Sequence, residues 1–519
     1  MKVRKKLLLA LCALSLFGMS VASAARPNII SIVVDDMGYS DLGSYGGEAE
    51  TPNIDRLAAK GYRFTNYRTY PKCMPTRDSL LSGLHAEPHG VMERAATIGE
   101  VLKAQGYQTY FCGKTHGELI PELTDVLNKG FVRSFGNTDG GNYFDHNVRP
   151  NYLDGALWEA DRPYYKTDVQ TDFALEFIDQ YQVDQKPFFL HLAYHAPHFP
   201  VQAHEKDIQK YLETYMAGPD ALRKARFERM KAQGIAPPEW KLSPSVASQA
   251  AWEALSLEQR EQEARVMATH TAMIDIIDQN IGRLLEKLEA MGCADNTMIT
   301  FVSDNGGTRE GGKGIWTGFR ASRMGKRYDR KAVIGSIDSH WQIGAAWENL
   351  VNTPFWKGKN TGYEGGDSAP LIVYYPGLMQ TPGTISRAEV AVWDLYPTWL
   401  DVAGASYPEQ YNGRELAPLV GTSLLPVFQG QELSERSFYF MWRQNKAFIH
   451  KGWKLVSGKS GKLGNLPWEL YDLNEDRAEQ HNLAKTHPEK LQEMVKALHL
   501  HLGEDAMQRI NQSSERKKK

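Results

Sequence analysis

The chain has 519 residues, of which 42% are hydrophobic and 24% are charged. This composition supplies enough apolar material for a large core and excludes a disordered or low-complexity protein, while the length favours one large and one small domain. With 60 basic and 62 acidic residues the net charge is −2, and no basic stripe points to nucleic-acid binding.

The first 24 residues have the pattern of a secretory signal peptide. Residues 2–6 form a cationic start, residues 7–17 form an apolar stretch too short to span a bilayer comfortably, and residues 22–24 form a small-residue cleavage site. An uncleaved membrane anchor is the alternative. A signal peptide predicts an exported protein, periplasmic or secreted. Because no second long apolar run follows, we expect no membrane span after cleavage.

Beyond this leader, strand patterns alternate with helical patterns. Residues 29–34 form a nearly continuous apolar, β-branched run, as buried parallel strands do. Thr51 and Pro52 supply a cap and a first-turn proline for a helix. Thr97 and Glu100 form a capping box for another. The alternation predicts an α/β fold with a mostly parallel central sheet covered by helices on both faces. Further strands are expected over residues 107–112, 188–194, 298–302 and 371–375, and a long amphipathic helix over residues 274–288.

Two segments depart from this alternation. Residues 204–265 are charged and poor in β-branched residues, which predicts a helical insertion. After residue 435 the pattern changes to short strands and a closing helix, so we expect a large domain over residues 25–435 and a smaller α+β domain over residues 436–519. The aromatic-rich residues 438–442 are interpreted as strand core rather than as a platform for a sugar.

Hard oxygen donors follow two of the predicted strands. Asp35 and Asp36 come directly after the first strand, and Asp304 and Asn305 come after a later one. The carboxyl ends of the strands in an open α/β sheet converge on one crevice, where ligands bind. Such donors suit Ca²⁺, with Mg²⁺ also possible. Ordinary turns would explain either motif alone, but two such motifs after buried strands favour a metal site.

Cys73 stands at a predicted helix start, because proline follows it two residues later. This places residue 73 near the positive end of the helix, where anions are stabilised, and Arg77 lies one turn further on. These features indicate an activated cysteine, and a buried structural cysteine is the alternative. Outside the leader the chain has three cysteines, an odd number that raises the question of whether one of them is reactive. Three cysteines in so long a chain do not form a disulfide framework.

The pattern Cys-x-Pro-x-Arg at residues 73–77, followed by Leu-Leu-x-Gly at residues 80–83, resembles the signature of the type I sulfatases. In that family a maturation enzyme oxidises the cysteine to formylglycine (3-oxoalanine), whose hydrated aldehyde attacks sulfur. The resemblance implies an alkaline phosphatase-like fold and hydrolysis of a small-molecule or carbohydrate sulfate ester, releasing sulfate and an alcohol or phenol. The overall pattern is most similar to bacterial arylsulfatases. The other matching segments are residues 27–38, 51–58, 113–116, 196–200, 303–306, 359–366 and 469–473.

The resemblance also implies two sets of site residues. The cation ligands are Asp35, Asp36, Asp304 and Asn305, with oxidised Cys73 completing the shell. The catalytic side chains around them are Arg77, Lys114, His116, His198 and Lys359.

Each of these side chains has an implied role. Arg77 and Lys114 hold and polarise the nucleophile, and His116 assists the aldehyde hydrate. Lys114, His198 and Lys359 bind sulfate or help the leaving oxygen depart, and His198 is the better candidate for protonating it. Cationic groups and a dication around a sulfate oxygen provide the charge complement that this chemistry needs.

The sequence departs from the family pattern at three places. Thr115 stands where tryptophan is common and Met74 where serine is common, although neither position usually takes part in the chemistry. Residues 307–356 do not align securely with the family. A long ordered loop is more often functional than accidental, so we expect this one to shape the substrate entrance.

Three alternatives remain open at this stage. His191, His195 and His198 have a spacing that could suggest zinc. A phosphonate monoester or phosphodiester hydrolase of the same fold would carry a similar site. A non-catalytic sulfate-ester binding protein would retain the fold without turnover.

Overall fold

The computed structural model of the protein describes residues 26–86, 90–115, 125–138, 142–144, 148, 150–309, 314–323, 325–459, 463 and 466–516. The expected signal peptide lies outside the described residues and stays a prediction. Within the described part of the chain, no helix combines the length and apolar character needed to cross a membrane.

A ten-stranded sheet forms the centre of the protein, in the order β15-β2-β14-β9-β1-β8-β4-β5-β6-β7. The five middle strands, from β9 to β5, run parallel to one another, and the strands that border them on the two sides, β14 and β6, are antiparallel to their neighbours. The parallel strands are β1 (Asn28–Val34), β4 (Gln108–Lys114), β5 (Arg133–Asn137), β8 (Phe188–Ala193) and β9 (Thr297–Ser303). The flanking strands are β2 (Tyr62–Phe64), β6 (Asn151–Leu153), β7 (Ala156–Trp158), β14 (Leu371–Tyr374) and β15 (Thr384–Ser386).

Strand β1 lies in the middle of this sheet, and all seven of its residues are buried. Its side chains divide between the two faces, as the two-residue period of a strand requires. Ile30 and Ile32 join the apolar core on one face, and Ile29 and Val33 join the core on the other. Burial on both faces explains why this strand is continuously apolar in sequence.

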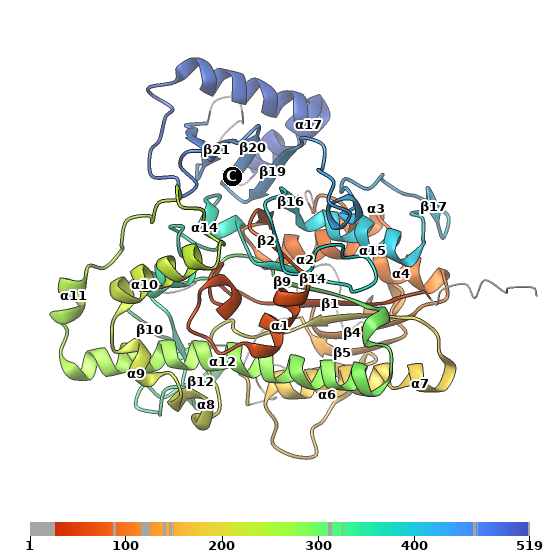
Figure 1. Ribbon diagram of the computed structural model, residues 1–519, viewed down its shortest axis with the longest axis horizontal. Helices are drawn as coiled ribbons and strands as arrows, with labels where there is room; N and C mark the ends of the chain where they lie inside the picture. Colours follow the sequence, from red (N-terminus) through yellow and green to blue (C-terminus); the bar gives the residue numbers. More distant parts are fainter. Residues whose placement is uncertain are drawn as a thin grey trace, which may run out of the picture.

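Helices cover both faces, which confirms the predicted α/β architecture (Figure 1). One layer packs on the core of Ile30 and Ile32, and the other packs on the core of Ile29 and Val33. The first layer contains α1 (Pro52–Lys60), α6 (Lys166–Ile178) and α12 (Leu257–Ala290). The second contains α2 (Cys73–Ser82), α4 (Ile98–Ala104) and α15 (Leu395–Ala403).

The caps at the helix starts agree in part with the sequence. The capping box of Thr97 and Glu100 is present at the start of α4. Pro52 is the first residue of α1, although the Thr51 side chain forms no capping hydrogen bond. Helix α12 extends well beyond the predicted residues 274–288, because Ser256 and Gln259 form a capping box at its start.

The segment expected to be a helical insertion is helical, and its last residues belong to α12. Its other helices are α8 (Glu205–Gln209), α9 (Leu212–Tyr215), α10 (Pro219–Ala232) and α11 (Gln249–Glu253). The long loop after β9 holds β10 (Gly318–Phe319), β11 (Ser322–Arg323), β12 (Lys326–Arg327), β13 (Trp341–Gln342) and α13 (Ala345–Val351).

A second, antiparallel sheet follows in the C-terminal part and packs against α17 (Pro488–Arg516) (Figure 1). Three of its aromatic residues, Phe438, Tyr439 and Phe440, are buried, as the interpretation of residues 438–442 as strand core requires. Trp442 at the strand end is only half-buried. The strands are β19 (Ser437–Trp442), β20 (Asn445–His450), β21 (Trp453–Ser457) and β22 (Glu469–Asp472).

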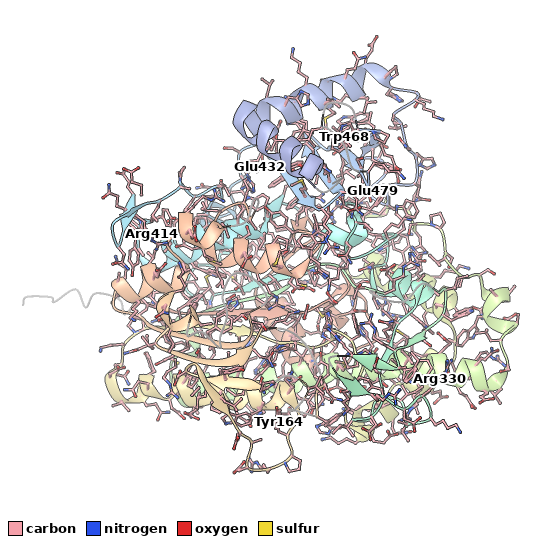
Figure 2. The ribbon with its side chains drawn as sticks, turned by 180° about the vertical axis from the view of Figure 1, so that it is seen from behind. Tyr164, Arg330, Arg414, Glu432, Trp468 and Glu479 are labelled. Carbon is pink, nitrogen blue, oxygen red and sulfur yellow. The ribbon has the colours of Figure 1, made fainter. Side chains whose placement is uncertain are left out.

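A buried ionic cluster joins this second sheet to the large part of the chain. Lys454 on β21 places its Nζ 2.7 Å from Glu364 Oε1, 3.0 Å from Asp367 Oδ2 and 3.1 Å from Glu479 Oε1. Arg68 from β3 (Tyr67–Arg68) lies 2.6 Å from the same Glu364 oxygen, and Arg477 pairs with the other oxygen of Glu364. Glu479 lies at the junction of the two parts (Figure 2). Losing one partner of such a buried group costs several kcal/mol, so this cluster fixes the second sheet in place.

Candidate active site

A group of oxygen donors lies where β1 and β9 end. The two strands pair in parallel with Val34 opposite Ser303, so the residues that follow them emerge side by side. Asn305 donates a hydrogen bond from Nδ2 to Asp36 Oδ1 at 2.7 Å, and the Asp36 amide donates to Asp304 Oδ1 at 3.3 Å. Asp36 has a φ of 67°, a left-handed conformation that is costly for a residue other than glycine and is often found at functional sites. The structure therefore brings together the residues predicted to hold a cation.

Cys73 is the first residue of α2 and is fully buried. Its Sγ lies within 4.8 Å of carboxylate oxygens of Asp35 and Asp304. One turn further along α2, Arg77 places Nε and Nη2 2.8 Å from Asp304 Oδ2 and donates from Nη1 to the carbonyl of Lys114 at 3.1 Å. Helix α2 begins at Cys73, as the sequence predicted, and it brings both the cysteine and the Arg77 guanidinium to the carboxylates.

Two lysines contact the same carboxylates from other elements. Lys114 at the end of β4 donates from Nζ to Asp35 Oδ2 at 2.5 Å. Lys359 lies with Nζ 2.7 Å from Asp36 Oδ1 and 2.9 Å from Asp36 Oδ2. Both lysines are buried, so their charges act in a medium of low dielectric constant, where ion pairing is strong.

His198 lies beside this group, with Nε2 3.4 Å from Asp36 Oδ2. Its Nδ1 lies 2.7 Å from the carbonyl oxygen of Phe199, which fixes the ring with Nδ1–H as the donor. Burial lowers the pKa of His198 to about 4, against the opposing charges of Asp36 and Asp35. The predicted site residue His116 lies outside the described residues.

Two carboxyl groups of the site have opposite pKa shifts. Burial alone would raise the pKa of Asp35, but nearby cations, Lys114 foremost, lower it well below its usual range. Burial and the adjacent Asp35 raise the pKa of Asp304 well above its usual range, despite Arg77. Neighbouring carboxylates in a buried site resist being ionised together unless cations compensate them.

The donor set fits a divalent cation. Within the described part of the chain, the buried atoms Asp35 Oδ1 and Asn305 Oδ1 have no hydrogen-bond partner. An unsatisfied buried oxygen is costly, and a bound cation removes that cost. Three carboxylates and one amide oxygen match the hard donors that Ca²⁺ and Mg²⁺ prefer.

The histidine spacing considered for zinc does not assemble a zinc site. His191 pairs through Nδ1 with Ser31 Oγ at 3.2 Å, inside the sheet. His195 lies between Gln170 and Asn137, with 2.7 Å contacts on both ring nitrogens. Among the described residues, the groups of close potential ligands include His198 but neither His191 nor His195.

The long loop adds residues that the sequence did not single out. Arg323 donates from Nη1 to the Phe199 carbonyl at 3.4 Å, and its guanidinium lies 5.0 Å from the Phe199 ring. His340 is buried beside the same ring, and among the described residues neither of its ring nitrogens has a hydrogen-bond partner. The only signal in the sequence was the loop's richness in Arg and Gly without periodicity. Its role at the substrate entrance stays a prediction.

Comparison with known proteins agrees with this fold and site. A family model described as Sulfatase matches residues 27–405, and one described as N-sulphoglucosamine sulphohydrolase, C-terminal, matches residues 355–508. An uncharacterised sulfatase of Schizosaccharomyces pombe is 31% identical over 91% of this chain and 93% of its own. The arylsulfatase of Klebsiella aerogenes is 30% identical over 81% of this chain and 96% of its own.

Among solved structures, that of Ps i-CgsB in complex with k-i-k-neocarrahexaose superposes with a TM-score of 0.65. It is 25% identical, and the match covers 91% of this chain and 92% of that one. An alkaline phosphatase-like sheet with a carboxylate centre at its strand ends defines a class of ester hydrolases. Within that class, the chain belongs to the type I sulfatase family, whose members hydrolyse sulfate esters.

Proposed function

We propose that this protein is an arylsulfatase-type sulfuric ester hydrolase that uses formylglycine made from Cys73 and a bound divalent cation. The observation that carries the proposal is the placement of Cys73 Sγ within 4.8 Å of two carboxylates, at the first residue of a helix. Ca²⁺ is the proposed cation, with Mg²⁺ as the alternative. Small-molecule and carbohydrate sulfate esters are the proposed substrates. Two of the matches described above, the N-sulphoglucosamine sulphohydrolase model and the neocarrahexaose complex, concern carbohydrates.

The cation would be held by Asp35, Asp36, Asp304 and Asn305, with oxidised residue 73 beside them. When bound, it would supply Lewis acidity toward a sulfate oxygen and favour an ionised hydroxyl at residue 73. Arg77 orients Asp304 through its 2.8 Å contacts and opposes the rise in the pKa of this carboxyl.

Residue 73 needs oxidation because a thiol is not the nucleophile of this family. The hydrated aldehyde offers one hydroxyl for attack on sulfur and a second whose deprotonation releases the sulfate. The N-terminus of α2 favours negative charge at this position, because the first backbone N–H groups of a helix have no partner within the helix and give its start a partial positive charge.

The remaining side chains would bind sulfate and handle the leaving oxygen. Lys114 and Lys359 present ammonium groups to the carboxylate centre, where sulfate oxygens would accept hydrogen bonds from them. His198, whose Nδ1–H donates to the Phe199 carbonyl, is the proposed proton donor to the departing alcohol or phenol oxygen. Because the pKa of its ring is lowered to about 4, Nε2 must first take up a proton, which the negative charge of a bound sulfate ester would favour. His116 would assist the hydrate, as the family resemblance implies.

Two parts of the proposal concern the chain as a whole. Residues 1–24 would direct export to the periplasm or the exterior, and a maturation enzyme would oxidise Cys73. Residues 25–435 would carry the chemistry, and residues 436–519 would form the small domain.

The decisive experiment is sulfate release from 4-nitrophenyl sulfate by the exported protein and by its Cys73→Ala variant. We expect turnover by the parent, near-complete loss in the variant, and a parent peptide whose mass shows an aldehyde in place of the thiol. A parallel assay with 4-nitrophenyl phosphate and a phosphonate monoester tests the rival substrate class. Faster hydrolysis of these than of the sulfate would replace the sulfatase proposal with the phosphoester one. No turnover of any ester by protein with oxidised residue 73 and bound Ca²⁺ would leave only a binding role.

A further inference from the structure

A small pocket lies between the large sheet domain and the tip of the hairpin formed by β19 and β20. It has a volume of about 170 Å³ and is lined by Lys72, Asn360, Trp442, Arg443, Gln444 and Asn445. The first two belong to the large part of the chain and the other four to the hairpin. We call this space the hairpin pocket.

The hairpin pocket directly adjoins the proposed catalytic residues. Lys72 precedes Cys73 and Asn360 follows Lys359, and consecutive Cα atoms lie only about 3.8 Å apart. The Asn360 amide donates to the carbonyl of Pro71 at 2.6 Å, which holds the two chain segments side by side. When the sulfate of a substrate lies between residue 73 and Lys359, the alcohol portion of that substrate can therefore reach the pocket.

The hairpin is held firmly in this position. Strand β20 approaches the segment after Asn360 so closely that a Cβ atom on Gly362 would lie 2.8 Å from the Lys446 carbonyl oxygen. On the neighbouring strand, Lys454 is part of the buried ionic cluster that joins the second sheet to the large part of the chain. A site whose walls are fixed before the ligand arrives loses less entropy on binding, so it can discriminate between ligands.

The chemistry of the pocket lining suits an acidic sugar. Trp442 is half-buried and supplies an aromatic face, over which the Arg443 guanidinium lies at 5.3 Å from the ring centroid. The three amide side chains can both donate to and accept from hydroxyl groups. Two of the six lining residues are cations and none is an acid, so the lining favours sulfate or carboxylate. The volume is below the roughly 300–1,000 Å³ typical of drug-sized ligands, which fits one sugar unit.

We propose that the hairpin pocket is a subsite for an anionic sugar unit of a sulfated carbohydrate substrate, with Trp442 and Arg443 as its specificity-determining residues. This inference rests on the proposed sulfatase function and names its substrate class. The scissile sulfate would occupy the site at residue 73, while a second acidic group would bind at the hairpin tip.

The test compares kcat/KM for 4-nitrophenyl sulfate with that for sulfated disaccharides of glucosamine, galactosamine and galactose, each with and without a second acidic group. The variants are Trp442→Ala and Arg443→Asn. Asparagine is chosen because Arg443 has a φ of 55°, a conformation that asparagine tolerates. Lys485→Ala is the matched control, since it removes an exposed cation from the same small domain.

For at least one disaccharide with a second acidic group, we expect kcat/KM to be about tenfold or more above the value for 4-nitrophenyl sulfate and above the value for the same disaccharide without that group. This is the effect of about one charge-assisted hydrogen bond. Each pocket variant should remove most of this advantage, and the control should retain it. The inference is overturned if no disaccharide has the advantage, or if the variants lower kcat/KM for every substrate in the same ratio. The absence of turnover with any substrate, 4-nitrophenyl sulfate included, would instead refute the sulfatase function itself.

Discussion

Replacing Lys454 with methionine tests whether the buried ionic cluster secures the second sheet. Methionine keeps most of the volume of the side chain but removes its charge, which leaves three buried acids facing two arginines. Lys454 is fully buried, and its Nζ contacts three carboxylates at 2.7, 3.0 and 3.1 Å. Breaking a buried ion pair by removing one partner costs about 3–5 kcal/mol. We therefore expect Lys454→Met to lower the free energy of unfolding by about that amount.

The loss should depend on pH, because burial raises the pKa of Glu479 to about 7 while Lys454 opposes the rise. A carboxyl whose pKa is raised in the folded protein contributes stability below its unfolded pKa and loses that contribution as pH rises through the folded value. The deficit of the variant should therefore be larger at about pH 8, where Glu479 is charged, than at about pH 5.5.

Urea denaturation at the two pH values, followed by fluorescence and circular dichroism, measures this effect. Lys454→Met combined with Glu479→Gln should recover more than half of the loss at the higher pH, because the double variant restores the charge balance. Lys451→Met is the control, since this exposed lysine should change stability by less than about 0.5 kcal/mol. A loss below about 1 kcal/mol for Lys454→Met, or a further loss in the double variant, would refute the reasoning.

Three further predictions concern the cation, the sulfate contact and a second buried acid. Asp304→Asn should raise the Ca²⁺ concentration needed for half-maximal activity by about 100-fold or more, as a calcium titration of chelator-treated enzyme would measure, since even indirect changes around a metal cost 10–100-fold. An unchanged calcium dependence would exclude Asp304 as a ligand. Lys359→Ala should lower kcat/KM for 4-nitrophenyl sulfate by about 10- to 100-fold, the effect of losing one charged hydrogen bond, with Lys357→Ala as a nearby control. Equal effects of the two lysine variants would argue against a sulfate contact. Burial raises the pKa of Glu348 to about 7, so the free energy of unfolding of the parent should fall relative to that of Glu348→Gln as pH rises from about 4.5 to about 7. If the free energies of unfolding of the two proteins change in parallel across this range, the raised pKa is contradicted.

The parts of the fold encoded by local patterns were predictable from the sequence. The apolar run at β1, the capping box at Thr97 and the cysteine at the start of α2 each depend on a few neighbouring residues. The convergence of Asp35 with Asp304 was also predictable, because parallel strands end at a common edge. The roles assigned to these residues stay predictions.

Contacts between distant segments were not predictable. Lys454, Glu364 and Arg68 form one cluster but lie far apart in the chain, and no local pattern pairs them. Trp442 belongs to an aromatic run that is otherwise core, and only the position of the hairpin tip shows that this residue also lines a pocket. Strand β14 was expected, but its antiparallel direction depends on the path of the long loop before it.

The distance in sequence between the parts of the site has a consequence for synthesis. Arg77 and Asp304, which meet beside Cys73, are separated by 227 residues. At about 5–20 residues per second, roughly 11–45 seconds pass between the appearance of the two on the ribosome. Until the later segment arrives, the Cys73 thiol cannot be enclosed as it is in the folded protein. This interval gives the proposed oxidising enzyme access to a group that the finished fold hides.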